Sequence, residues 1–159
     1  MDYIIREKNN GDNSWINEKL KENWGSSIIV SRRKKYEQSD LSGFVIENNE
    51  KKLGICLYRI ENNECEMVVL EAFEQGKGIG TALVDKLIES CSNARIKRIW
   101  LITTNDNIDA LRYYQKHGFE FVCIYRNEIE YSRKIKPEIP IIGNYGITIK
   151  DEIEMEKVL

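Results

Sequence analysis

The stretch Gln75-Gly76-Lys77-Gly78-Ile79-Gly80-Thr81 decides how this chain is interpreted. Its glycines lack a β-carbon, so backbone N–H groups of the turn can approach an anion closely. The run Cys65–Leu70 before it reads as a buried strand, and apolar residues after it recur at helical spacing (Ile79, Leu83, Val84, Leu87, Ile88, Cys91). A strand, a glycine-rich turn and a helix N-terminus form a phosphate cradle, because the helix dipole and its unpaired N–H groups favour negative charge. The stretch therefore predicts a phosphorylated cofactor.

Two common phosphate-binding motifs do not fit this stretch. A nucleotide-triphosphate loop needs Ser or Thr directly after its Gly-Lys pair, whereas Gly78 follows Lys77 here. The dinucleotide pattern needs a third glycine where this chain has Leu83. An ordinary tight turn between a strand and a helix stays open as an alternative.

A second segment repeats the order of strand, turn and helix. Residues 99–104 (IWLITT) are apolar enough for a strand, and the polar residues 105–107 (NDN) can cap the helix expected over residues 108–117. Gly118 suits the left-handed position after a helix, and the apolar run 119–124 predicts another strand. The segment is therefore a second unit of α/β type.

Both segments resemble the signatures of one family. The pattern Gln-x-x-Gly-x-Gly, at Gln75, Gly78 and Gly80, resembles the acyl-CoA pyrophosphate loop of the GNAT superfamily of N-acetyltransferases. The string Asn107-x-x-Ala110-x-x-Tyr113-Tyr114-x-Lys116-x-Gly118-Phe119 is similar to the second signature of that superfamily, in the expected order. The resemblance is close over residues 65–119 and loose outside them.

The resemblance implies a fold, a reaction and a cofactor site. The fold would be α/β: one domain over residues 1–159 with a mixed, mostly antiparallel sheet and helices on both faces. The reaction would transfer the acetyl group of acetyl-CoA directly to a primary amine of a small molecule or a peptide. Residues 75–81 would hold the pyrophosphate, while the strand end at Val69, Leu70 and Glu71 would offer backbone groups to the pantetheine arm and the thioester.

Strand and turn signals outside the two signatures complete the expected fold. We expect strands over residues 2–6, 27–31, 43–47, 53–61 and 64–71, with Asn62-Asn63 as a hairpin turn, because Asn tolerates positive φ. Ser14 is expected to cap a helix with Trp15, Ile16, Leu20 and Trp24 on one face, and residues 129–135 a short helix ending before Pro137. Residues 147–156 alternate apolar and charged side chains, which predicts a half-buried strand.

Tyr114 is the main candidate for catalysis. Asn107 and Tyr114 are seven residues apart, so they share a helix face. A phenol with an ordinary pKa of about 10 stays protonated at neutral pH and can donate to a leaving thiolate, and the resemblance points to the same residue. Core packing by an aromatic ring is the alternative. Asn107 would bond the pantetheine amide or act only as a helix cap.

The general base is expected among the carboxylates of the strand before the loop. Glu66 could take the proton of the amine directly or through water, with Glu64, on the same strand face, as the alternative. A structural or substrate-orienting role for Glu66 stays open. His117, the single histidine, is expected to offset the helix dipole in solvent rather than catalyse. One histidine and scattered cysteines indicate neither a metal site nor a nucleophilic triad.

The amine pocket is less well marked. Trp24, Arg32, Tyr58 and the extended tail 139–146 are the candidates, since long ordered loops often shape binding sites. The basic run 32–35 is expected to be solvated, and the acidic residues Glu152, Glu154 and Glu156 either attract a cationic amine or form an exposed sheet face.

Composition excludes several classes of protein. The chain has 159 residues, a net charge of −2 and 42% hydrophobic residues, so it fits one domain without a nucleic-acid signal. No apolar run approaches the roughly 20 residues of a membrane span. The cysteines Cys56, Cys65, Cys91 and Cys123 form no C-x-x-C pair, which favours reduced thiols in the cytoplasm. We expect an acetyltransferase; a non-catalytic acyl-CoA sensor is the alternative, and a homodimer stays open.

Overall fold

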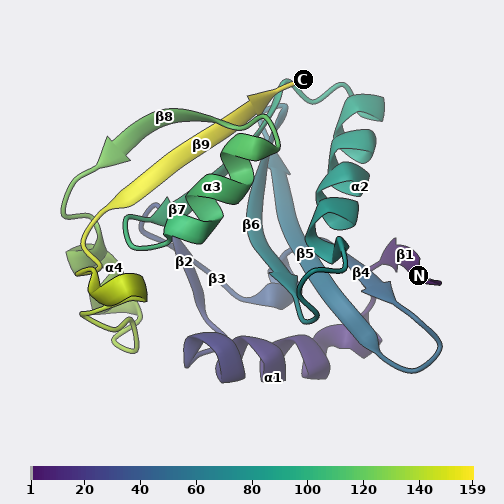
Figure 1. Cartoon of the computed structure of the whole chain (residues 1–159), viewed down its shortest axis with the longest axis horizontal. Coiled ribbons are helices and arrows are strands. Elements are labelled where there is room, and N and C mark those ends of the chain that lie inside the picture. Colours follow the sequence, from purple (N-terminus) through teal and green to yellow (C-terminus); the bar gives the residue numbers. More distant parts are fainter. Residues whose placement is uncertain (1) are drawn as a thin grey trace. The chain divides into compact units, whose positions relative to one another are not determined.

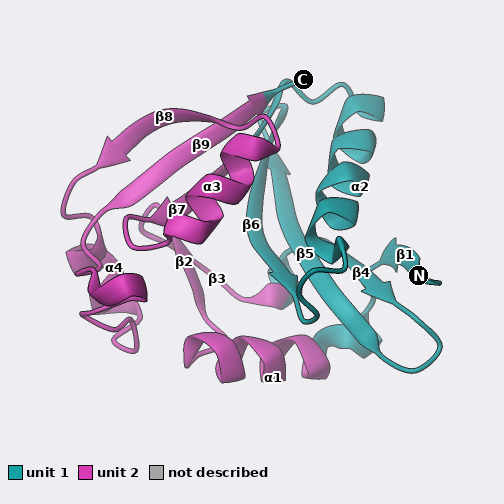
Figure 2. Ribbon diagram, in the orientation of Figure 1, with its two compact units in different colours: residues 1–13, 39–99, 158–159 teal, residues 14–38, 100–157 magenta. Residues whose placement is uncertain are grey.

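The computed structural model describes residues 2–159, which form two compact units. One unit comprises residues 1–13, 39–99 and 158–159, and the other comprises residues 14–38 and 100–157 (Figure 2). A seven-stranded sheet, mostly antiparallel, and four α-helices make up the fold, which confirms the expected α/β class (Figure 1). Among the described residues, no helix is both long and apolar enough to cross a membrane.

The first unit contains the strand order β1-β4-β5-β6 and helix α2. Its elements are β1 (Ile4–Glu7), a 3-10 turn at Asn10–Asp12, β4 (Ser42–Glu47), β5 (Lys52–Glu61), β6 (Glu64–Ala72) and α2 (Ile79–Asn93). Each neighbouring pair of these strands is antiparallel. The β5–β6 turn is formed by Asn62 and Asn63 at φ 54° and 61°, as their tolerance of positive φ predicted.

A bulge in β6 changes the simple alternation that we expected there. Leu57 pairs with Val69 and Tyr58 with Met67, so Val68 has no partner on β5. A bulge of this kind bends the strand and re-aims the side chains that follow it. Cys65, Glu66 and Met67, which precede the bulge and pair regularly with β5, are all buried, so both faces of this part of β6 are covered.

Helix α2 packs on β4, β5 and β6 of the same unit. Gly54 permits the close approach, because a β-carbon there would lie 2.6 Å from the Glu71 carbonyl oxygen and 2.8 Å from Ile79 Cγ2. The helix side chains Ile79, Leu83 and Leu87 are fully buried, and so are Leu53, Ile55 and Leu57 of β5. Burying each one stabilises the fold by about 1.5–3 kcal/mol. The buried contact fixes where α2 begins relative to the end of β6.

The cysteines are free thiols, as expected. Cys56, Cys65 and Cys91 are buried, while Cys123 is half-buried. Burial raises the pKa of the Cys56 thiol to about 12, so it remains a neutral thiol at physiological pH.

The second unit contains β7, β9 and β8 in that order, together with a separate two-stranded sheet. Its elements are α1 (Asn13–Trp24), β2 (Ile29–Ser31), β3 (Lys34–Tyr36), β7 (Arg98–Thr104), α3 (Ile108–Lys116), β8 (Glu120–Tyr125), α4 (Ile129–Ile135), a 3-10 turn at Asn144–Gly146 and β9 (Glu152–Val158). Strand β7 begins in the first unit, and α1 begins at the last residue of the first segment. Helix α4 has the predicted boundaries.

Within the basic run 32–35, which was predicted to be solvated, Arg33, Lys34 and Lys35 are exposed, whereas Arg32 is half-buried. Arg32 and Arg33, at φ 48° and 64°, form the turn of the β2–β3 hairpin, and we had expected a polar loop there. Arg32 Nη1 lies 3.1 Å from Glu152 Oε1, and Arg33 forms an ion pair with Glu128. Lys34 and Lys35 are exposed, as expected. The distant carboxylates, which local sequence does not reveal, order the turn.

A final strand forms, as predicted, but it starts later than expected and its first half is buried on both faces. Residues 151–155 are all buried, and β9 starts at Glu152, so residues 147–150 lie outside it. Glu152 and Glu154 therefore do not form an exposed acidic face: Glu152 pairs with Arg32, and Glu154 accepts a hydrogen bond from the Tyr125 hydroxyl at 2.9 Å. Burial raises the pKa of Glu152.

The tail after α4 folds back on itself instead of remaining extended. Ile142 pairs with Thr148, and Gly143 N–H donates to the Ile147 carbonyl at 2.8 Å. The Asn144 N–H donates to the buried carboxylate of Asp106 at 2.9 Å, which attaches the tip of this small hairpin to the start of α3.

Candidate active site

The loop at residues 75–78 is exposed and shaped by two left-handed glycines. Gly76 and Gly78 have φ 73° and 71°, a region that side chains with a β-carbon rarely adopt. A β-carbon built at either position would meet nothing within 4 Å, so both glycines border open space. The loop thus leaves its backbone accessible to a ligand.

The N-terminus of α2 lacks a cap from the chain itself. Gly78 is the N-cap residue and no side chain bonds to the first turn, which also contains no acidic residue. The first N–H groups of a helix have no partner inside the helix, and together with the helix dipole they favour an anion. A 15-residue helix that begins this way fits a phosphate group, so residues 75–81 fit the pyrophosphate of an acyl-CoA.

The end of β6 remains paired with β5 through the three residues expected to contact the pantetheine arm. Val69, Leu70 and Glu71 pair with Leu57, Cys56 and Ile55, respectively. Val69 is buried, whereas Leu70 and Glu71 are partly exposed. Their proposed backbone contacts to a thioester stay a prediction.

Glu66 is buried and already has a cationic partner. Its side chain is 2% exposed, and Arg59 Nε donates to Glu66 Oε2 at 2.8 Å from the paired position on β5. Glu64, the alternative base, is 38% exposed and pairs with Arg98 at 3.2 Å. Arg59 was not among the expected site residues, although its place opposite Glu66 follows from the predicted hairpin. Arg59 therefore orients the Glu66 side chain.

Helix α3 carries the other expected site residues. Asn107 is its N-cap residue but makes no capping bond; its Nδ2 donates to Thr103 Oγ1 at 3.1 Å, so a role only as a cap is wrong. The half-buried Tyr114 ring packs edge-on against Tyr113 and Phe119, with centroids 5.3 and 5.5 Å apart. Gly118, at φ 83°, ends the helix in the left-handed conformation expected. These contacts fix the plane of the Tyr114 ring.

His117 packs at the C-terminus of α3 rather than standing free in solvent. Its ring lies 4.1 Å from the Tyr113 ring, and its Nδ1 is 2.8 Å from the Tyr113 carbonyl oxygen. Lys157 Nζ donates to the His117 carbonyl at 2.9 Å, which places a positive charge at the negative end of the helix. Lys157 therefore helps to offset the negative end of the α3 dipole, a role that we had assigned to the imidazole of His117.

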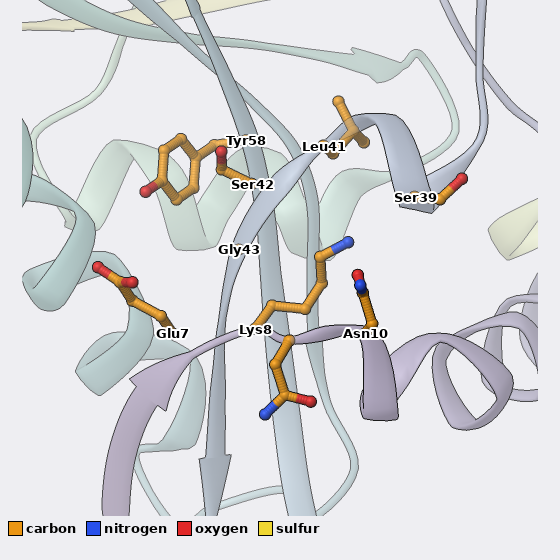
Figure 3. Close-up of a pocket in the computed structure, with 9 residues that line it drawn as sticks. Glu7, Lys8, Asn10, Ser39, Leu41, Ser42, Gly43 and Tyr58 are labelled. Carbon is orange, nitrogen blue, oxygen red and sulfur yellow. The ribbon is translucent and has the colours of Figure 1, made fainter.

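Tyr58 lines a polar cavity of about 310 Å³ in the first unit (Figure 3). Side chains of Glu7, Lys8 and Asn10 approach the cavity from the end of β1 and the turn after it. Burial raises the pKa of Tyr58 to about 12 and lowers the pKa of Lys8.

The other two pocket candidates, Trp24 and Arg32, lie in the second unit. The Arg32 guanidinium stacks 3.3 Å from the centre of the Tyr125 ring and pairs with Glu152. The ring of Trp24 lies 5.4 Å from Lys136 Nζ. Within residues 2–159, no group of three or more His, Cys, Asp or Glu side chains is arranged to hold a metal ion.

The arrangement matches known proteins in sequence and in fold. The model of the acetyltransferase (GNAT) family matches residues 13–119. Two proteins of Bacillus subtilis are similar over most of the chain: YdhI is 38% identical over 137 residues, and YxbD is 40% identical over 141 residues. These alignments cover 86% of both chains for YdhI, and 88% of this chain and 89% of the relative for YxbD. A GNAT family acetyltransferase from Elizabethkingia anophelis, solved with acetyl-CoA bound, has a TM-score of 0.75 at 19% identity, covering 99% of this chain and 98% of that one.

The chain therefore belongs to the GNAT family of acetyltransferases. Its uncapped α2 N-terminus lies directly after the glycine pattern on which the family resemblance was based.

Proposed function

We propose that this acetyltransferase moves the acetyl group of acetyl-CoA directly to the primary amine of a small molecule or a peptide. The observation that carries the proposal is the open N-terminus of α2 behind Gly76 and Gly78, a site without a negative partner from its own first turn. Acetyl-CoA supplies an activated acyl group as a thioester. The residues of this chain must bind it, accept the proton of the amine and protonate the leaving thiolate.

We assign the individual roles from the family resemblance. Residues 75–81 donate backbone N–H groups to the pyrophosphate, Val69–Glu71 and Asn107 bond the pantetheine arm, and Tyr114 gives a proton or a hydrogen bond to the thiolate. Glu66, oriented by Arg59, accepts the proton of the amine directly or through water. Trp24, Arg32 and Tyr58 remain the proposed pocket residues, although Arg32 must exchange its contact with Glu152 in order to bind a substrate. The free thiols support a cytoplasmic location.

The test is Tyr114→Phe, which deletes one hydroxyl and keeps the ring contacts with Phe119. We expect kcat to fall by about 10²–10⁴-fold, the usual effect of removing a positioned acid, with little change in KM. Thiol release from acetyl-CoA is measured against a panel of amines that includes polyamines, amino acids and peptides. An acyl donor with a more acidic thiol should reduce the difference in kcat between the variant and the parent, because its thiolate leaves without a proton donor.

Tyr113→Phe is the matched control, since that ring faces about 100° away on the same helix and packs on His117. Equal losses at positions 113 and 114, or no loss at either, would show that α3 only packs beside the cofactor. A parent protein that binds CoA and acetylates no amine would favour an acyl-CoA sensor.

A further inference from the structure

Two buried polar side chains of the second unit lie one helical turn apart at the end of α4. Ser132 is 2% exposed and Lys136, the C-cap residue of α4, is 6% exposed. The Lys136 N–H donates to the Ser132 carbonyl at 2.8 Å, which joins the two positions along the helix axis. Residues spaced by four positions share a helix face, so the two side chains project from the same side of α4.

Neither polar group has a hydrogen-bonding or ion-pair partner among residues 2–159. The Ser132 hydroxyl is buried without a hydrogen bond. Lys136 Nζ lies 5.4 Å from the Trp24 ring, and the nearby carboxylate of Glu138 is exposed. Burial lowers the pKa of Lys136 because the charged form is poorly solvated there.

Two arginines of the same unit, unlike Lys136, form ion pairs with carboxylates. Arg32 lies 3.1 Å from Glu152, and Arg33 pairs with Glu128. A buried hydroxyl without a hydrogen bond is unfavourable. The Lys136 ammonium, at the end of a largely buried side chain on the same helix face, has no anion beside it. A single anion that contacted both groups would satisfy them together.

We propose that Lys136 and Ser132 bind one oxyanion group, a carboxylate or a phosphate, of a small ligand. The ammonium supplies the charge and up to three donors, and the hydroxyl supplies another donor. The indole of Trp24 forms an apolar wall beside the ammonium. The oxyanion is either a free ion or the anionic group of the amine substrate; this second source rests on the proposed function.

The first experiment measures anion binding without any turnover. The unfolding midpoint of the parent is followed while inorganic phosphate or acetate is added at constant ionic strength. A ligand that binds only the folded state raises the midpoint in a saturable way. We expect that rise in the parent, a smaller rise in Ser132→Ala and none in Lys136→Met.

Lys134→Met is the matched control. Lys134 belongs to the same helix and also lies beside an aromatic ring, with its Nζ 5.2 Å from the Tyr131 centre, but it is exposed. This variant should keep the rise of the parent. The proposal is overturned if the parent shows no saturable rise with either anion, or if Lys136→Met shows the same rise.

The unfolding midpoint of Lys136→Met without added anion is a second test of the proposal. Lys136→Met removes a charge without an anion from a largely buried side chain and keeps a chain of similar length, so we expect its unfolding midpoint to lie above that of the parent. A midpoint clearly below that of the parent would mean that the ammonium has a stabilising partner in the folded protein, and it would contradict the proposal.

The second arm separates the two sources of the oxyanion. The amine panel contains pairs that differ only by a carboxylate, such as lysine and cadaverine. If the substrate carries the oxyanion, Lys136→Met raises KM about tenfold or more for the carboxylate member alone, as expected from losing a charged hydrogen bond. If Lys136→Met changes KM equally for the two amines of a pair, while added anion raises the unfolding midpoint of the parent, the bound oxyanion is a free ion. If no amine is acetylated, the proposed function fails while the thermal measurement still decides on the anion site.

Discussion

The N-termini of α1 and α2 are built in opposite ways. Before α1, the Asn9 side chain accepts the Gly11 N–H at 2.8 Å, and the Asp12 carboxylate accepts the Asn9 N–H at 2.9 Å. Before α2, Gly78 offers no side chain, and no capping bond is made. The first end satisfies its donors within the chain, while the second leaves its donors for a ligand.

The charges at the two ends follow the same contrast. Asp12 is buried, receives both terminal nitrogens of Arg6 at 2.9 Å, and lies 2.7 Å from Lys52 Nζ. The first turn of α2 contains no acidic residue. Negative charge at the start of α1 therefore stabilises the fold, whereas at α2 we propose that a bound anion supplies it. Substitutions at the two ends should accordingly change different measured quantities.

The largest expected effect is on CoA affinity, from Gly78→Val. The branched side chain would stand in the open space that an anion must enter, on a backbone at φ 71° that valine resists. Losing two charge-assisted hydrogen bonds, at about 1.5–3 kcal/mol each, corresponds to at least a hundredfold weaker binding. Titration calorimetry with CoA measures the change.

Gly146→Val is the control for backbone strain. Gly146 also has a left-handed φ, 72°, and open space around its missing β-carbon, but it belongs to the tail hairpin. Both variants should lose similar stability, while Gly146→Val keeps its CoA affinity. A folded Gly78→Val variant that binds CoA like the parent would remove the contrast between the two helix ends.

The N-terminus of α2 could be predicted from the sequence because its signals are local. Glycine spacing, the apolar period after Ile79 and the Asn62-Asn63 turn each act within a few residues, and the structure confirms the helix and the turn. We had predicted that Ser14 caps the first helix. The capping residue is Asn9 instead, because a 3-10 turn precedes α1 and the helical segment starts earlier in the chain.

The features that sequence did not reveal depend on contacts between distant positions. Arg32 meets Glu152 across 120 residues, and no pattern near residue 32 indicates that a carboxylate is available. The burial of Lys136 is likewise set by tertiary packing and not by its own helix. Of the candidate site, the glycine-rich loop 75–81 was therefore accessible to sequence reasoning, whereas the charged neighbours of the proposed pocket residues were not.

The next largest effect is on stability, from Asp12→Asn. The substitution leaves Arg6 and Lys52 without their shared buried carboxylate, and breaking such a pair typically destabilises a fold by about 3 kcal/mol or more. Urea unfolding at neutral pH measures the loss, and CoA affinity should remain that of the parent. Glu22→Gln, in an exposed pair with Lys19 at 3.3 Å, should change stability by less than about 1 kcal/mol.

The pH dependence checks the origin of that effect. The bonds from Arg6 lower the pKa of Asp12 in the folded protein. Its contribution is thus fully present above the unfolded pKa of about 3.9 and is lost as pH falls from there through the folded value. The gap in stability between the parent and Asp12→Asn should narrow in acid. A gap that stays constant down to pH 2 would mean that shape, and not charge, explains the loss.

The smallest effect is expected from Asn9→Ala, which removes the cap and leaves Asp12 in place. Its side chain bonds one N–H in an exposed turn, and loss of such a cap usually destabilises a protein by about 1 kcal/mol. CoA affinity and kcat should stay those of the parent, because donors at this end serve the fold alone. Unfolding measures the stability of Asn9→Ala, and titration calorimetry on the same sample measures its CoA affinity. Weaker CoA binding in Asn9→Ala would show that the two helix starts are coupled, and the division between a structural end and a ligand-binding end would then be wrong.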